Sequence, residues 1–501
     1  MRTRTRIGLA MAAVMILVAA GAAIFSSSTR SSLDQYKAGL RAKGEKLQVT
    51  ELAVALSTNA EEIACRNIFA TNICPTPKLV PSIMSFAGPG KARVAWKNEL
   101  KVDNAKGTWE ELEAQVAAAE PSLRLFRQGL EHPAPDSGWA YRNDFESNRK
   151  GPKLNYVMKR TVAQSLMGAE ICALHRGDFD EAFKNLHALA NLARLEKNDL
   201  PLAWGMVRVA IAGVGLAATW EALQAPGWDE TRLAQLQRDW EQFNALDALE
   251  RGVLGERAMN QSIMAWVRTA SSKDFAGLIG GVVKSSGMAV KQSGWTFRSF
   301  WKNQVLHTAY KVGGINADEL AQLDYYASIL TGIRQLQANQ GYAQVGNSAS
   351  NAGAMLDKKM QADHWHRLKM SAIIVPNLSR GTQTAVENET LRRLTIAALA
   401  IKRYELKHGA PPAELEALTP ELLAAVPLDP MSGKPLCYRL NADRTFVLYS
   451  TGEDGKDDGG DATPVKTVVT SSWIGRDAVW PTAVTGEEPV GMIRTQAKLE
   501  K

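Results

Sequence analysis

Residues 445–461 read TFVLYSTGEDGKDDGGD. The first six residues are mostly β-branched or aromatic, which predicts a strand over Thr445–Ser450. An acidic loop follows, with four aspartates and one glutamate within residues 453–461 and glycines that let the backbone turn tightly. Ca²⁺ prefers about six to eight oxygen ligands from carboxylates, hydroxyls and carbonyls. The loop therefore indicates either a Ca²⁺ site or a solvated acidic turn, because Asp-Gly turns are also common without metal.

The residues before this strand predict a small α+β module. A helical pattern runs from Leu378 to His408, and Gly409 can supply its left-handed cap. A turn-rich run leads to a second strand, Leu436–Leu440, and residues 441–444 form a hairpin loop between the two strands. The predicted order is thus long helix, loop, hairpin and acidic loop.

This order, with its residues, resembles the major pseudopilin of type II secretion systems over about residues 373–461. The shared pieces are Val375-Pro376-Asn377-Leu378, Ala400 to Gly409, Leu415 to Leu418, Asp429-Pro430, Gly433-Lys434-Pro435, Tyr438, and Leu448 to Gly455. The resemblance implies a terminal loop that binds Ca²⁺ and locks the small sheet against the helix. The ligands it implies are the Leu448 carbonyl, the Ser450 hydroxyl, and carboxylates among Asp454, Asp457, Asp458 and Asp461.

The chain also departs from that family. The apolar run Ser371–Val375 before the helix is too short to span a bilayer, and the N-terminus lacks the pilin leader and its cleavage site. The nearest element similar to the family's closing Asp-Ile pair is Asp477-Ala478. We therefore expect a pilin-like head on another kind of protein rather than a fibre subunit.

The N-terminal segment, residues 1–30, predicts a membrane anchor. Three arginines precede an uncharged, mostly apolar run of 19 residues, Ile7–Phe25. That length can cross the hydrocarbon core, and the basic flank predicts a cytoplasmic N-terminus. The alternative is a signal peptide cleaved after Ala20-Gly21-Ala22. We expect a single-pass protein of the bacterial cytoplasmic membrane with its bulk outside the cytoplasm, or a soluble exported protein if the segment is cleaved.

Residues 31–365 predict an extracytoplasmic α-helical domain. Helical patterns joined by short turns favour antiparallel hairpins. They cover Leu154–His175, a helix opening at Asp178, an apolar helix from Pro201 to Leu223, and a stripe from Leu233 to Leu249 in a helix that begins at Asp229. The turn Arg176–Ala182 resembles the inter-helix turn of a tetratricopeptide unit. The glycine-rich stretch Phe275–Gly287 is interpreted as a flexible crossover between two helical halves, with a membrane-touching or partner-binding segment as the alternative. Gly341–Ala354 is interpreted as a linker. The pilin-like module then occupies residues 370–485, and residues 486–501 form a tail.

Composition and charge indicate a globular protein and argue against a nucleic-acid partner. The chain has 501 residues, 45% of them hydrophobic, so it can bury a substantial core. Its net charge of +7 is spread thinly, and no basic cluster with interleaved aromatics indicates a nucleic-acid partner. Cys65 and Cys74 could form a disulfide in an oxidising compartment or remain buried free thiols.

Catalytic motifs are absent from the sequence. It contains no HExxH, GxSxG, Walker or GxGxxG pattern. We therefore expect a non-enzymatic envelope protein, structural or protein-binding, with Ca²⁺ as a structural cofactor and a protein partner in the envelope. A link to secretion follows only from the resemblance. The alternative is an extracytoplasmic hydrolase with an unrecognised site in the helical domain.

Overall fold

The computed structural model describes residues 26–75, 108–149, 155–285, 310–362, 370–462 and 477–483, together with short pieces at 85–88, 91–94, 96, 101–102, 105–106 and 307–308. The predicted anchor Ile7–Phe25 and the tail 486–501 lie outside these residues. The protein is mainly helical, with 67% helix and 4% strand, which confirms the predicted class.

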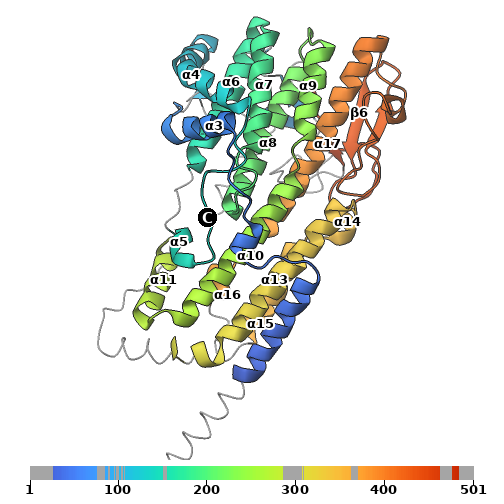
Figure 1. Ribbon diagram of the computed structural model, residues 1–501. Coiled ribbons are helices and arrows are strands. Elements are labelled where there is room, and N and C mark those ends of the chain that lie inside the picture. Colours follow the sequence, from blue (N-terminus) through green and yellow to red (C-terminus); the bar gives the residue numbers. More distant parts are fainter. Residues whose placement is uncertain are drawn as a thin grey trace, which may run out of the picture.

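The long helices form an elongated body with an upper and a lower part (Figure 1). The upper part contains α3 (Ala60–Thr71), α4 (Trp109–Leu130), α6 (Tyr156–Arg176), α7 (Phe179–Arg194), α8 (Leu202–Leu223) and α9 (Glu230–Glu241). The lower part contains the helix over residues 26–42, α11 (Ser272–Ser285), α13 (Ile315–Gln337), α15 (Ser348–Gln361) and α16 (Ser371–Ile374). Shorter helices are α2 (Val49–Leu52), α5 (Phe145–Arg149), α14 (Tyr342–Val345) and the 3-10 helix η2 (Leu415–Leu418).

Two helices, α10 (Ala245–Thr269) and α17 (Ser379–His408), connect the two parts. Helix α10 packs against α8 above and against α13 below. Helix α17 contributes Ala385 and Val386 to the lower hydrophobic core and Leu394 to Ile401 to the upper one. Because α17 packs against α8, α9 and α10, the segment after residue 370 and the helical segment before it share hydrophobic cores.

The described residues also form three small sheets. The predicted hairpin is confirmed: β5 (Cys437–Leu440) pairs antiparallel with β6 (Phe446–Ser450), and Tyr438 lies opposite Leu448. Strand β7 (Ala478–Val479) pairs with the other edge of β6. The remaining strands are β1 (Ser85–Gly88), β2 (Lys91–Arg93) and β8 (Thr482–Ala483) in one sheet, and β3 (Lys101–Val102) with β4 (Ala105–Lys106) in another.

The helix boundaries follow from local chemistry that the sequence already contains. The side chain of Asp178 accepts a hydrogen bond of 3.0 Å from the amide of Glu181 and starts α7. Gly177 and Gly409 both adopt positive φ, at 74° and 76°, and end α6 and α17. These are the boundaries expected from the Gly and Asp signals in the sequence.

Three expectations about helices were wrong. The stripe Leu233–Leu249 is not one helix, because Asn244 caps a new helix by accepting hydrogen bonds from the amides of Leu246 and Asp247. The expected crossover is helical over Ser272–Ser285, since Phe275 packs into a core with Tyr310; residues 286 and 287 lie outside the described residues. The expected linker Gly341–Ala354 forms α14 and the start of α15.

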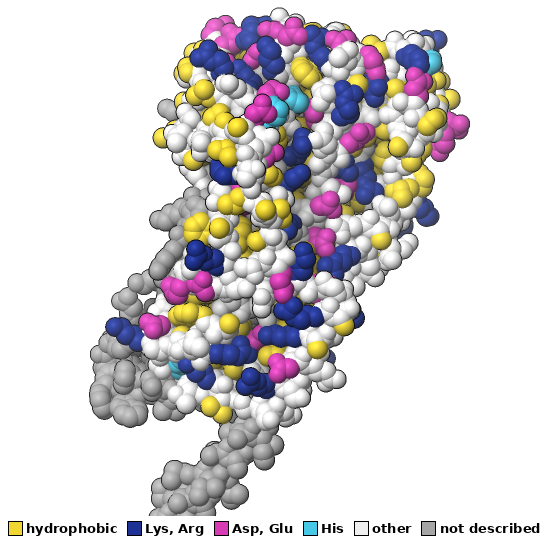
Figure 2. All heavy atoms as spheres, in the orientation of Figure 1, with side chains coloured by type: hydrophobic (Ala, Val, Ile, Leu, Met, Phe, Trp, Pro, Cys, Tyr) yellow, Lys and Arg dark blue, Asp and Glu magenta, His cyan; other side chains and the backbone are white. Residues whose placement is uncertain are grey.

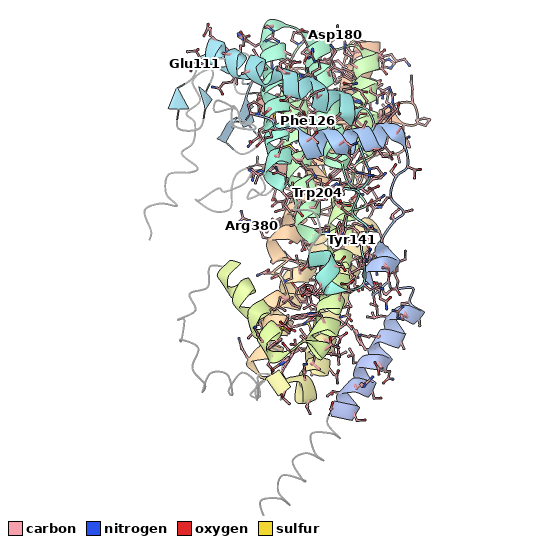
Figure 3. The ribbon with its side chains drawn as sticks, turned by 60° about the vertical axis from the view of Figure 1, so that its left-hand side comes forward. Glu111, Phe126, Tyr141, Asp180, Trp204 and Arg380 are labelled. Atoms are coloured by element: carbon pink, nitrogen blue, oxygen red, sulfur yellow. The ribbon has the colours of Figure 1, made fainter. Side chains whose placement is uncertain are left out.

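Helix α8 is the one helix among the described residues that is long and apolar enough to cross a membrane, and 67% of its apolar window is buried. It packs against α6, α7, α10 and α17. Trp204 of α8 and Phe126 of α4 lie within the bundle (Figure 3) and are almost fully buried. Arg208 of α8 is also buried, and its Nε donates a 2.8 Å hydrogen bond to the carbonyl of Ala193.

Candidate functional site

A buried carboxylate, Asp429, lies in the turn before the hairpin and contacts the residues from which the acidic loop starts, Ser450 and Thr451. Oδ1 of Asp429 accepts from the Ser450 hydroxyl at 2.7 Å and from the Met431 amide at 2.9 Å. Oδ2 accepts from the Thr451 amide and hydroxyl, both at 3.1 Å, and from the Ser432 hydroxyl at 3.0 Å. The side chain thereby joins its own turn to the end of β6. Sequence analysis did not assign it this role, although Asp before a tight turn is a known signal for hydrogen bonds to backbone amides.

Two of the six ligands implied by the resemblance, the Ser450 hydroxyl and the Leu448 carbonyl, form hydrogen bonds with other protein groups. The Ser450 hydroxyl donates to Asp429 and accepts from the amide of Gly452 at 3.3 Å. The Leu448 carbonyl accepts from the amide of Trp480 at 2.8 Å. Both oxygens therefore connect β6 to its neighbours.

The middle of the loop wraps around a second buried carboxylate, Asp477. This side chain accepts from the amide of Gly460 at 2.7 Å and from the amide of Asp458 at 3.2 Å. Burial, followed by the like charges of Asp457 and Asp458, raises the pKa of Asp477. The charges of Asp457 and Asp458 thus act on the Asp477 carboxyl.

Asp457 has polar partners of its own in the loop. Its Oδ1 accepts hydrogen bonds from the Gly459 amide and from the Tyr449 hydroxyl, each at 2.9 Å. These two bonds, with the Gly459 amide first, lower the pKa of Asp457. The side chain is thereby held as a carboxylate close to Asp477.

Asp454 and Asp461 lie at the two ends of the loop. The Asp454 carboxylate accepts from the amide of Lys456 at 3.1 Å and lies 3.8 Å from the Lys456 ammonium group. The backbone carbonyl of Asp461 accepts from the amide of Asp477 at 3.0 Å. Asp461 therefore closes the loop onto the strand that follows, while Asp454 lies on the outer turn.

The loop docks on α14 and α17. A Cβ at Gly455 would lie 2.5 Å from the Cβ of Ala343, so only glycine permits this approach. Gln383 of α17 donates hydrogen bonds to both Glu387 and Glu453. Burial and the charge of Glu453 raise the pKa of Glu387 to about 7. The loop thus adds negative charge to one side of α17.

The described part of the chain contains no group of three or more His, Cys, Asp or Glu side chains arranged as a metal ion would require. The six predicted ligands are divided between β6, the loop centre around Asp477 and the outer turn. Of these, Asp457 and Asp458 are brought together with Asp477, a residue that sequence analysis did not propose as a ligand.

The four cysteines are free thiols in the structure, so the Cys65–Cys74 disulfide is not formed. Both side chains are buried in the upper core. The Cys74 thiol lies 3.4 Å from the hydroxyl of Ser165, and burial raises the pKa of both thiols, that of Cys65 to about 11.

No protein family, curated protein or solved structure matches this chain in sequence or fold comparisons. Its function must therefore be inferred from its own residues.

Proposed function

We propose that this chain is a non-enzymatic, membrane-anchored protein of the bacterial envelope that binds a protein partner, with its C-terminal acidic loop stabilised by Ca²⁺. The observation that supports the calcium assignment is that Asp457 and Asp458 lie in the loop that wraps around the buried Asp477. The Asp477 carboxylate accepts hydrogen bonds from the amides of Asp458 and Gly460, so like charges repel one another in this loop. A divalent cation would offset this repulsion and hold residues 457–461 against β7.

Calcium would act here as a structural element. The loop would bind Ca²⁺ only when the chain is folded, because the unfolded chain does not hold its ligands together. The free energy of Ca²⁺ binding would therefore add to the stability of the folded state. Because the loop contacts α14 and α17, the stabilisation would extend to both parts of the body. A pseudopilin-like role in secretion rests on the sequence resemblance alone.

The test is a calorimetric Ca²⁺ titration of the full chain in detergent, paired with melting curves with Ca²⁺ and with chelator. We expect about one ion per chain and a higher melting temperature with Ca²⁺. Asp458→Asn should remove this increase and leave the chelated melting temperature unchanged. The control is Asp357→Asn, an exposed aspartate on α15 that should keep the full increase. An equal response of both variants would exclude the loop as the site.

The anchor is tested separately, by alkaline extraction of membranes that contain the full chain. Retention in the membrane fraction is expected if residues 7–25 form a transmembrane helix. Release into the soluble fraction, with a shortened N-terminus, would instead indicate a cleaved signal peptide.

A second candidate function, hydrolysis, is favoured by one pair of side chains in the helical segment. The Ser272 hydroxyl, at the start of α11, lies 2.9 Å from Nδ1 of the buried His307. A serine next to an imidazole is the core of a nucleophilic site, although no carboxylate among the described residues orients this histidine. Covalent labelling by a fluorophosphonate probe that is lost in Ser272→Ala would support a hydrolase and contradict the non-enzymatic proposal.

A further inference from the structure

A cleft opens in the lower part of the body, between the helix over residues 26–42, α2, α10 and α13. Its volume is about 230 Å³. That is below the roughly 300–1,000 Å³ typical of sites for drug-sized ligands, so the cleft suits a small molecule. Its polar lining includes Lys37, Arg41, Gln48, Gln261, Arg268 and Glu319. Three cationic side chains and one carboxylate line the cleft, which leaves a net charge of +2.

A buried carboxylate holds two of these cations in place. Glu319 is only 1% exposed, and it pairs with Lys37 and Arg268 from two different helices. Arg268 lies 2.5 Å from Oε2 of Glu319 and also donates to Asn316 at 3.0 Å. Both contacts use the same guanidinium nitrogen, so the other nitrogens of Arg268 remain for a ligand as far as the described residues show.

The third cation, Arg41, stands at the rim of the cleft. It donates a 2.8 Å hydrogen bond to Glu51, and its side chain is 48% exposed. Lys37 and Arg268 are 30% and 34% exposed. Each of the three can therefore be reached from solvent while its position is fixed by a carboxylate.

The remaining lining gives the cleft an apolar wall, formed by Leu47, Val49, Ala258 and Ala265. A cationic rim beside an apolar wall suits a molecule with an anionic group on a small carbon skeleton. Figure 2 shows Lys and Arg side chains gathered over the lower part of the body, where the helix over residues 26–42 lies in Figure 1. These charges would also attract an anion toward the cleft.

We propose that this cleft binds a small soluble organic anion, with its phosphate or carboxylate group held by Arg41, Lys37 and Arg268. A membrane lipid offers the same chemistry, but the geometry disfavours it. Along a helix rising 1.5 Å per residue, Lys37 lies about 16 Å and Arg41 about 22 Å beyond residue 26, where the described chain begins. If residues 7–25 form the anchor of the proposed function, that distance exceeds the reach of the headgroup layer next to it.

The first experiment measures binding of phenyl phosphate to the full chain in detergent by calorimetry at fixed ionic strength. Inorganic phosphate and phenol serve as comparators. We expect phenyl phosphate to bind more tightly than inorganic phosphate, and phenol not to bind, because both the charge and the apolar wall are required. Absence of phenyl phosphate binding would overturn the proposal.

Variants locate the site. Arg41→Gln should weaken phenyl phosphate binding at least tenfold. The matched control is Arg30→Gln, which removes an exposed arginine of the same helix that does not line the cleft, and it should bind as tightly as the natural chain. Lys359→Gln, on the exposed face of α15, should have no effect. Arg268→Gln tests the inner cation, and binding unchanged in both Arg41→Gln and Arg268→Gln would reject this cleft as the site.

The lipid alternative is tested in nanodiscs. Phenyl phosphate binding should be equal in discs of phosphatidylcholine and of phosphatidylglycerol. Loss of binding in phosphatidylglycerol alone would show that lipid headgroups occupy the cleft, and it would overturn the assignment to a soluble ligand.

Discussion

The hydroxyl of Ser450 donates a 2.7 Å hydrogen bond to Oδ1 of Asp429, and both side chains are buried. This contact joins two segments that are 21 residues apart, the Asp-Pro turn and the end of β6. Asp429, which lies outside the acidic loop, therefore ties the end of the hairpin to the turn that precedes it.

Asp429→Asn should lower the free energy of unfolding by about 2–4 kcal/mol. The amide has one acceptor oxygen in place of two, and its NH₂ group would face buried donors, whose loss of partners costs about 1–3 kcal/mol each. Urea unfolding measures the change. The control is Asp443→Asn in the exposed hairpin turn, where Oδ1 accepts from the Thr445 amide at 3.0 Å and where we expect less than about 1 kcal/mol. Equal losses would contradict the central position of Asp429.

The carboxyl group of Glu170 should lower the free energy of unfolding as the pH rises. It is fully buried in α6, and burial, followed by the charge of Glu221 on α8, raises its pKa well above the ordinary value of 4.5. A carboxyl with a raised folded-state pKa contributes stability that is fully present below its unfolded pKa and is lost as pH rises through its folded pKa.

Glu170→Met should therefore be more stable than the natural chain at pH 8, by about 1–3 kcal/mol, and should differ less at pH 5. Neither carboxyl oxygen of Glu170 has a hydrogen-bond partner among the described residues, so removing both oxygens leaves no donor unsatisfied there. Urea unfolding at the two pH values tests this. Glu416→Met, at an exposed position, should show no such pH dependence; a less stable Glu170→Met at pH 8 would mean that the carboxylate has a structural role.

His187 should stabilise the upper bundle at low pH. Its Nδ1 lies 2.7 Å from Oδ2 of the buried Asp239. Burial lowers the pKa of His187, but the hydrogen bond and charge of Asp239 outweigh this, so the pKa is raised. The contribution is full below the ordinary value of 6.5 and is lost as pH rises through the raised pKa. His187→Gln should thus lose about 1–2 kcal/mol more at pH 6 than at pH 9. In denaturant titrations the exposed His408→Gln serves as the reference, and a pH-independent loss in His187→Gln would rule out the charged pair.

Two Gly→Ala substitutions in helices should change the stability of the protein in opposite directions. A Cβ at Gly255 of α10 would lie 2.0 Å from the carbonyl oxygen of Leu200, so Gly255→Ala should cost at least about 2 kcal/mol by forcing backbone apart. A Cβ at Gly353 of α15 meets nothing within 4 Å, so Gly353→Ala should stabilise the helix by up to about 1 kcal/mol. Melting temperatures of the two variants check the predicted difference in sign.

Much of the helical architecture could be predicted because its signals are local. Asp178 caps α7 and Gly409 ends α17 through contacts within one turn of the chain. The hairpin followed from two strand patterns separated by a short turn. One prediction failed because a polar residue inside an apolar stripe, Asn244, caps α10 and so separates it from α9. Two others failed because Gly-containing stretches form helices that pack on α10 and α13.

The sequence by itself determined the class of the fold, the helix caps, the hairpin and the acidic character of the loop, because each depends on residues a few positions apart. Only the tertiary structure decided that α17 is shared by two cores and that Lys37, Arg41 and Arg268 line one cleft. It also decided that Asp429 accepts a hydrogen bond from Ser450 and that Asp477 accepts one from Gly460. These relationships join residues that are distant in the chain, and they arise from how buried faces pack together, which no local pattern specifies.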